Sequence, residues 1–164
     1  MLLKTCIGIL CIAATLGANQ KPMEIAMNDS VDRGDALLLA SERYINFINR
    51  ISHGEVFPQI EEAATIFATD CKKIFNAHLH TENRNDFVTD LLAVYATYGS
   101  WTLIPAEVIR APESNTVVLR IFIESALIGT NTAIVILRYD SNYLITEINE
   151  VFSPVKGSYN FEEK

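Results

Sequence analysis

The sequence has few glycines, prolines and basic residues, and these shortages exclude several classes of protein. With 7 glycines and 5 prolines in 164 residues, a collagen-like or low-complexity chain is excluded. There are 13 basic against 20 acidic residues, a formal net charge of -7, and no basic cluster longer than Lys72-Lys73. We therefore expect no nucleic-acid partner, because nucleic-acid binding needs clustered Lys and Arg. The hydrophobic content of 49% is typical of one acidic globular domain.

The longest apolar run stands at the N-terminus. A short start that includes the basic Lys4 precedes the apolar residues 5–16, and small residues ending at Ala18 follow them. This layout predicts a secretory signal peptide over residues 1–18, with export to the periplasm or the extracellular space. The run is too short for a permanent bilayer anchor, so we expect no stable membrane insertion. An uncleaved membrane tether is the alternative.

Cysteine is scarce, and the predicted cleavage makes it scarcer. Cys6 and Cys11 would leave with the signal peptide, although a lipid anchor on one of them is an alternative. Cys71 alone remains, so no internal disulfide can form and the core must hold the domain together. Because no nucleophile motif surrounds Cys71, we interpret it as a buried, unreactive thiol.

Helical spacing dominates the first half of the mature chain. We expect a flexible lead-in over residues 19–29 and helices over about 30–54, 58–67 and 86–98, with a short strand over 71–76 and a loop over 78–85 between the last two. The first helix shows the three-four spacing of a buried stripe, made by Leu37, Ala40, Tyr44, Ile48 and Ile51. Gly54 and Gly99 provide its C-terminal stop and that of the third helix.

After Gly99 the hydrophobic period becomes that of strands. Four segments are expected, over residues 101–111, 116–127, 131–140 and 143–152, separated by turn compositions that suit antiparallel connections. Helices followed by strands predict an α+β domain over residues 30–153, with three N-terminal helices packed on a curved antiparallel sheet. Residues 154–164 are expected to form a loosely ordered tail.

Two of these strands are apolar on both faces. Residues 117–119 and 133–137 do not alternate as a sheet with one solvated face should. Helices can cover only one face, so we expect the other to be buried against a second copy, which makes the protein a homodimer. The alternative is a central strand covered by its own chain.

The order of these elements resembles the nuclear transport factor 2-like superfamily, a cone-shaped, cystatin-like α+β fold that includes ketosteroid isomerase and polyketide-cyclase-like proteins. The segments that carry the resemblance are Glu42-Arg43-Tyr44-Ile45, Ile66-Phe67-Ala68-Thr69-Asp70 and the last strand, 143–152. The resemblance covers about residues 30–153. It implies an apolar pocket with a few polar groups at its mouth, and frequent dimerisation, but no single chemistry.

The chemistry of ketosteroid isomerase is not expected in this chain. It needs a carboxylate base on the early strand and an oxyanion hole made by a tyrosine and a protonated aspartic acid. Tyr44 stands at the tyrosine position, but the base position falls at Phe75-Asn76, and residues 133–137 of the later strand are apolar. Two of the three parts are missing.

Five residues are candidates for a pocket: Tyr44, Asn76, Trp101, Tyr139 and Glu147. An ordinary core is the favoured interpretation of the three aromatic residues, and a surface pair across strands is that of Glu147. His78, His80 and Glu82 could ligate a metal only if their loop folded back, so we expect neither a metal nor a cofactor.

Two functions are consistent with these residues. The first is an exported, non-catalytic domain that binds a protein partner or a small apolar ligand. The second is an isomerase-, cyclase- or dehydratase-type enzyme on the same scaffold, with Tyr44 as hydrogen-bond donor and a carboxylate such as Glu147 or Glu124 as base. An ionisable side chain inside the cone would favour the enzyme.

Overall fold

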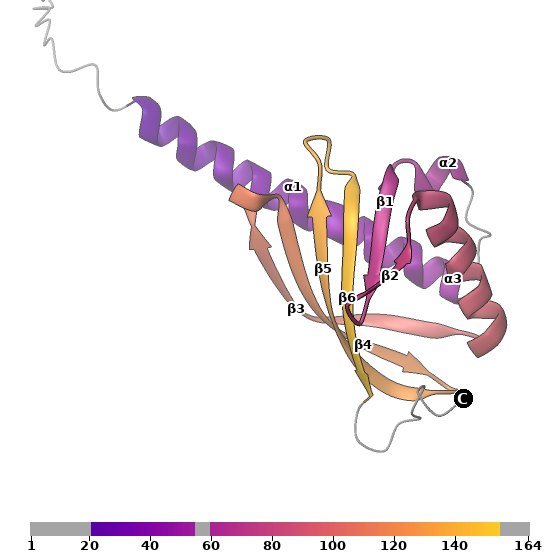
Figure 1. The fold of residues 1–164 in the computed structure, drawn as a ribbon. Helices are drawn as coiled ribbons and strands as arrows, with labels where there is room; N and C mark the ends of the chain where they lie inside the picture. The colour runs from indigo at the N-terminus through magenta and orange to yellow at the C-terminus, as the bar shows by residue number, and fades with distance from the viewer. Residues whose placement is uncertain (1–20, 55–59, 155–164) are drawn as a thin grey trace, which may run out of the picture.

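The computed structural model describes residues 21–54 and 60–154 of the chain, so the predicted signal peptide and all of the predicted tail except Pro154 lie outside the described residues. The fold is α+β, as predicted. In chain order its elements are α1 (Lys21–Ser52), α2 (Ile60–Ala63), β1 (Phe67–Phe75), β2 (His78–Thr81), α3 (Arg84–Tyr98), β3 (Trp101–Ala111), a 3-10 turn η1 (Pro112–Ser114), β4 (Thr116–Ser125), β5 (Gly129–Tyr139) and β6 (Ile145–Pro154). Figure 1 shows α1 crossing behind a curved sheet.

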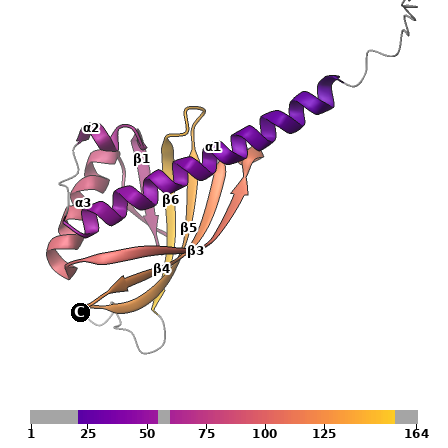
Figure 2. The ribbon, with the colours of Figure 1, turned by 180° about the vertical axis from the view of Figure 1, so that it is seen from behind.

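Helix α1 is longer than the sequence suggested. It begins at Lys21 rather than near Asp29, so most of the predicted lead-in is helical. The physical reason is that residues 23–27 are mainly good helix formers and follow a proline in the first turn. The helix therefore begins before the polar residues at which the sequence predicted its start. Its N-terminal part projects beyond the sheet (Figure 2). Gly54 follows its end at φ 69°, as expected of a helix stop.

The segment between the first and third helices contains a hairpin that was not predicted. The expected loop over 78–85 is in part strand β2, which pairs antiparallel with β1. The turn consists of Asn76 (φ 47°) and Ala77 (φ 66°), two consecutive left-handed residues. Such turns match the twist of the two strands, but Asn-Gly is the usual pair, so Asn-Ala gave no clear signal.

Helix α3 agrees with the third predicted helix and begins slightly earlier. Asn83 caps its N-terminus, because the side-chain oxygen of Asn83 accepts a hydrogen bond from the Asp86 amide at 3.0 Å. Gly99 ends the helix at φ 70°, and its amide donates to the Tyr95 carbonyl at 2.8 Å. Its buried residues Phe87, Val88 and Leu91 pack toward the sheet.

The sheet is mixed rather than wholly antiparallel. Its six strands have the order β2-β1-β6-β5-β4-β3. Strands β3 to β6 form the predicted antiparallel meander, but β1 pairs parallel with β6. This pairing joins strands about 75 residues apart in the chain, with Phe75 opposite Glu150, and no local pattern encodes it.

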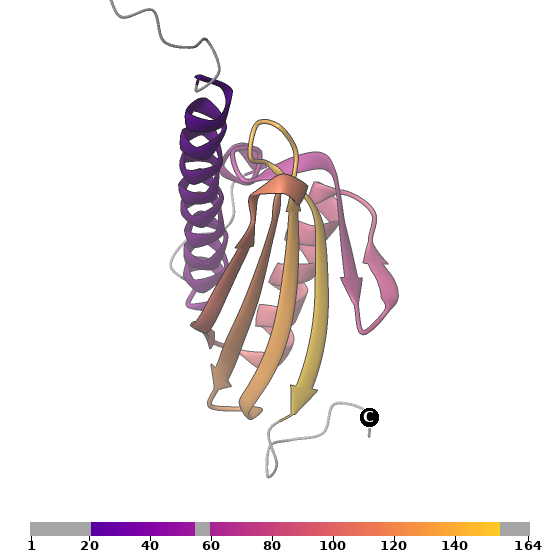
Figure 3. The same ribbon diagram turned by 90° about the vertical axis from the view of Figure 1, so that its left-hand side faces the viewer.

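The helices pack on the inner face of the sheet. The inward residues of β4 and β5, among them Leu119, Ala133 and Val135, are almost fully buried. On the outer face, Ile134 remains 39% exposed and Val151 54%. Figure 3 shows no helix over this outer face in the described part of the chain. The strands that are apolar on both faces therefore bury one face inside the domain and leave the other partly open.

Candidate binding cavity

A cavity of about 740 Å³ lies between helices α1 and α3 and the inner face of the sheet. This volume is in the range of sites that hold drug-sized ligands. The apolar and aromatic residues of its wall are Tyr44, Ile48, Phe75, Phe87, Leu91, Val94, Tyr98, Trp101, Leu103, Ile121, Ile123, Ile128 and Phe152. The polar remainder is Lys73, Asn76, His78, His80, Asp90 and Glu150. The interior is thus largely apolar, with ionisable groups gathered on one side.

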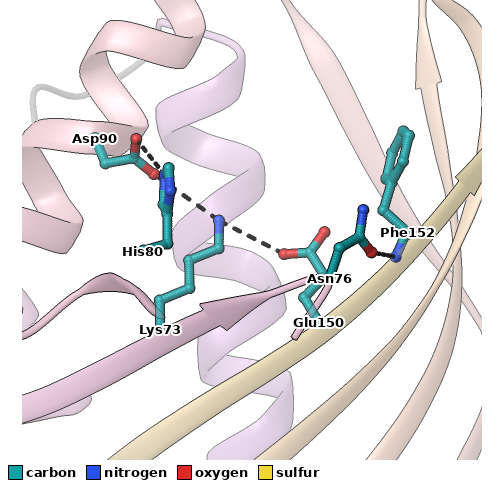
Figure 4. A network of polar contacts seen from close by, with 6 residues as sticks. All are labelled: Lys73, Asn76, His80, Asp90, Glu150 and Phe152. Carbon is teal, nitrogen blue, oxygen red and sulfur yellow. Dashed lines mark hydrogen bonds and ion pairs between the residues drawn. The ribbon is translucent and has the colours of Figure 1, made fainter. Parts of the chain in front are cut away.

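These ionisable groups form a connected cluster (Figure 4). The Lys73 ammonium lies 3.5 Å from Glu150 Oε2 and 3.9 Å from Asp90 Oδ2. Asp90 Oδ1 in turn contacts His80 Nε2 at 2.9 Å. The cluster joins β1, β2, α3 and β6, so it depends on the parallel pairing of β1 with β6.

Lys73 is held in a largely apolar setting. Its side chain is 13% exposed, and that of Glu150 is 12% exposed. The Lys73 ammonium stands 5.7 Å from the centre of the Phe75 ring and 5.6 Å from that of Phe87, the range of cation–π contacts. A charge so far out of water needs partners, and the two carboxylates and the two rings provide them.

Tyr44 supplies a neutral polar group beside this cluster. It is buried on α1 and lines the cavity. Burial and then the nearby Glu150 carboxylate raise the pKa of the Tyr44 phenol well above its usual value. The phenol therefore keeps its proton and can donate a hydrogen bond at any physiological pH.

Asn76 connects the β1–β2 turn to β6 at the edge of the cavity. Its backbone N–H donates to the backbone carbonyl of Glu150 at 2.9 Å, and its side-chain oxygen accepts from the backbone N–H of Phe152 at 2.9 Å. These two bonds fix the strand segment that carries the Glu150 carboxylate. Asn76 is therefore a positioning residue for the cluster.

The five candidate pocket residues fall into two groups. Tyr44, Asn76 and Trp101 line the cavity. Tyr139 is buried on β5 but is not among the lining residues, and burial raises the pKa of its phenol. Glu147 lies on the outer side of the sheet, where its carboxylate accepts from Arg138 Nε at 3.1 Å. Glu124 lines a shallow hollow at the end of β4 instead.

The sequence interpretation missed the three central members of the cluster, although the chain carries signals for two of them. Lys73 alternates with the buried Cys71 along β1, which places both on the inner face. Asp90 lies three residues after Phe87 on α3, at the spacing of the buried stripe. Neither residue is among the five candidates for a pocket.

Glu150 could not be found in this way. In β6, Ile145 and Ile148 both point inward although they are three residues apart. The pairing of β6 with β5 has a register shift between Arg138 and Tyr139 of β5. The residues of β6 beyond this shift therefore point to the opposite face of the sheet from the one that strict alternation predicts. Strict alternation from Ile145 would place Glu147 inside, whereas the shift places Glu150 there.

The remaining candidates have simpler surroundings. His78 and His80 line the cavity, and over residues 21–54 and 60–154 no three His, Cys, Asp or Glu side chains are arranged to hold a metal ion. Cys71 is a buried free thiol, as predicted, and burial raises its pKa to about 12. No helix within the described residues has the length and apolar character needed to cross a bilayer.

Comparison with known proteins identifies the fold. No protein-family model and no curated protein sequence matches the chain. A candidate isomerase of the SnoaL-like family from Agrobacterium tumefaciens matches its structure with a TM-score of 0.60 and 8% identity, over 73% of this chain and 98% of that one. A nuclear transport factor 2-like protein from Anabaena variabilis matches with a TM-score of 0.59 and 15% identity, over 74% and 92%. An LEH-like epoxide hydrolase from M. tuberculosis matches with a TM-score of 0.56 and 11% identity, over 73% and 84%.

These likenesses confirm the resemblance seen in the sequence at the level of the fold. Proteins described as having a cystatin fold are among the matches as well. The matched structures include a candidate isomerase and a hydrolase on one scaffold, so the likeness assigns no activity. The function has to be argued from the cavity itself.

Proposed function

We propose that this chain, which has the nuclear transport factor 2-like fold, binds a small, largely apolar molecule in the cavity between α1, α3 and the sheet. The observation that carries the proposal is a cavity of about 740 Å³ whose apolar wall has its ionisable groups on one side. Natural ligand sites combine the same two features, an apolar body and a few polar groups that fix orientation.

Trp101 makes this proposal easy to test, because it is the single tryptophan of the chain and it lines the cavity. Titration with adamantylmethanol, which does not absorb where tryptophan emits, should change the Trp101 fluorescence and reach saturation. Ile123→Phe, which adds bulk inside the cavity, should weaken this binding.

The matched control is Ile134→Phe, the same change on the outer face of the sheet, where the side chain is 39% exposed. It should leave the titration unchanged. A fluorescence change that does not saturate, or one that Ile123→Phe and Ile134→Phe alter equally, contradicts binding in the cavity.

An acid–base enzyme is the second candidate function. It is favoured by the ionisable groups inside the cone, where Glu150 rather than Glu147 is the carboxylate close enough to affect Tyr44. Glu150 would be the base and the Tyr44 phenol the hydrogen-bond donor to the substrate. We rank binding first because it needs only the cavity and its lining, whereas catalysis would also need Glu150 to take a proton from the substrate while it is paired with the Lys73 ammonium 3.5 Å away.

Catalysis would be seen as exchange of a ketone's α-hydrogens for deuterium in D2O, measured by NMR with a panel of cyclic ketones. Loss of this exchange in Glu150→Gln, together with unchanged ketone binding, would support the enzyme. Saturable binding without exchange would support a binding module.

Export and self-association are also part of the proposal. The predicted signal peptide supports export, and the mass of the secreted protein would test cleavage after Ala18. The outer face supports a homodimer because Ile134 and Val151 expose apolar surface on adjacent strands. Ile134→Glu should then shift the mass in light scattering from dimer to monomer, and a monomeric unmodified protein would contradict the dimer.

A further inference from the structure

The charges and rings of the cavity favour one class of ligand. We propose that the molecule bound there is an apolar amine, present as a monocation, with its ammonium group against Glu150. This inference rests on the proposed function, namely that the cavity binds a small apolar molecule, and it specifies that this molecule carries a positive charge.

The cluster carries more negative than positive charge. Among the residues that the structure describes, Lys73 is the single lysine or arginine of the wall, and it faces the two carboxylates of Asp90 and Glu150. The other ionisable lining groups are the imidazoles of His78 and His80 and the phenols of Tyr44 and Tyr98. With neutral imidazoles the cavity therefore holds one uncompensated negative charge, which is costly in an apolar setting until a cation pairs with it.

Neither carboxylate is fully satisfied by Lys73. The distances of 3.5 Å to Glu150 and 3.9 Å to Asp90 are both longer than a charge-assisted hydrogen bond. Asp90 is engaged by His80 through Oδ1, while its Oδ2 is buried without a hydrogen-bond partner. Because His80 already holds Asp90, the Glu150 carboxylate at the cavity wall is the one left to pair with a ligand cation.

Aromatic rings complete a site for a cation. In the described part of the chain six of them line the cavity, those of Tyr44, Phe75, Phe87, Tyr98, Trp101 and Phe152. Aromatic faces attract ammonium groups and repel carboxylates, and the Lys73 ammonium already occupies such a position beside Phe75 and Phe87. An anionic ligand would meet both the rings and the excess carboxylate, so the wall disfavours it.

Three probes of nearly the same shape separate the effect of ligand charge on affinity from that of ligand size. They are adamantylmethylammonium, adamantylmethanol and adamantane carboxylate. Each is titrated into the full mature protein at about pH 8, above the titration of free imidazole, with Trp101 fluorescence as the readout. We expect the ammonium to bind on the order of tenfold more tightly than the alcohol, because it adds a charged hydrogen bond and cation–π contacts. The carboxylate should bind weakest.

A pair of variants on strand β6 tests the role of Glu150. Glu150→Gln removes the excess charge and should lower the affinity for the ammonium, relative to that for the alcohol, on the order of tenfold. Glu147→Gln is the matched control, because Glu147 pairs with Arg138 on the outer side, and it should change neither affinity. If Glu150→Gln does not fold, the ranking of the three probes on the unmodified protein decides alone.

The outcomes distinguish the inference from the proposed function. If the alcohol or the carboxylate binds as tightly as the ammonium, the amine proposal is overturned and cavity binding stands. If the ammonium is preferred and Glu150→Gln keeps that preference, the assignment to Glu150 is overturned. If no probe gives a saturable change, cavity binding fails and the amine proposal fails with it.

Discussion

Ala77→Gly in the turn between β1 and β2 should stabilise the protein. Ala77 has a φ of 66°, a region that costs a residue with a Cβ about 1–2 kcal/mol and costs glycine nothing. Glycine also has more conformational freedom in the unfolded chain, and this entropy offsets about 0.4–1 kcal/mol of the stabilisation gained by relieving the strain. The expected net increase in the free energy of unfolding is about 0.5–1 kcal/mol, or about 1–4 °C in Tm for a chain of this size.

Thermal unfolding followed by circular dichroism measures this difference. Ala93→Gly is the control, because Ala93 is an exposed residue within α3, where glycine should lower the free energy of unfolding by about 1 kcal/mol. The same substitution should therefore act in opposite directions at the two positions. A lower Tm for Ala77→Gly would refute the reasoning, since it would show that the turn does not hold Ala77 in the left-handed region.

The remaining predictions concern three residues away from the cavity cluster. Gly54→Ala should destabilise the protein by about 1–3 kcal/mol in urea unfolding, because a Cβ there would lie 2.6 Å from Tyr95 Oη at a φ of 69°. Gly34→Ala should stabilise it by about 1 kcal/mol in the same assay, because a Cβ within α1 would make an ordinary contact of 3.7 Å with Pro112. The Cys71 thiol, with its pKa raised to about 12, should not react with a disulfide reagent until the protein unfolds. Since the folded state holds this proton more tightly, the contribution of Cys71 to stability should be complete below about pH 8.5 and be lost as the pH rises toward 12. Rapid labelling of the folded protein would contradict the burial.

Most of the fold could be predicted from the sequence because it is encoded locally. The three-four spacing around Tyr44 places the buried stripe of α1, and alternation after Gly99 predicts the four strands of the meander. The strand β2 and the early start of α1 were missed because an Asn-Ala turn and a polar stretch inside a helix are weak local signals. The parallel pairing of β1 with β6 was missed because it depends on residues far apart in the chain.

The cavity shows the same division between local and long-range information. Tyr44 and Trp101 could be placed as aromatic residues of buried elements, which is where the structure has them. Glu150 could not, because one register shift in the β5–β6 pair reverses which acidic residues face inward. The charged cluster forms only when β1 and β6 lie side by side, so local sequence patterns do not predict it.

The most direct measurement for the cavity is a crystal structure of the mature protein with adamantylmethylammonium. The adamantyl cage should lie between Trp101 and Ile123, with its nitrogen within hydrogen-bonding distance of the Glu150 carboxylate. A cage bound in the cavity with its nitrogen turned away from Glu150 would contradict the amine assignment. A cavity without the probe, under conditions that saturate the fluorescence change, would contradict the account of the site as a whole.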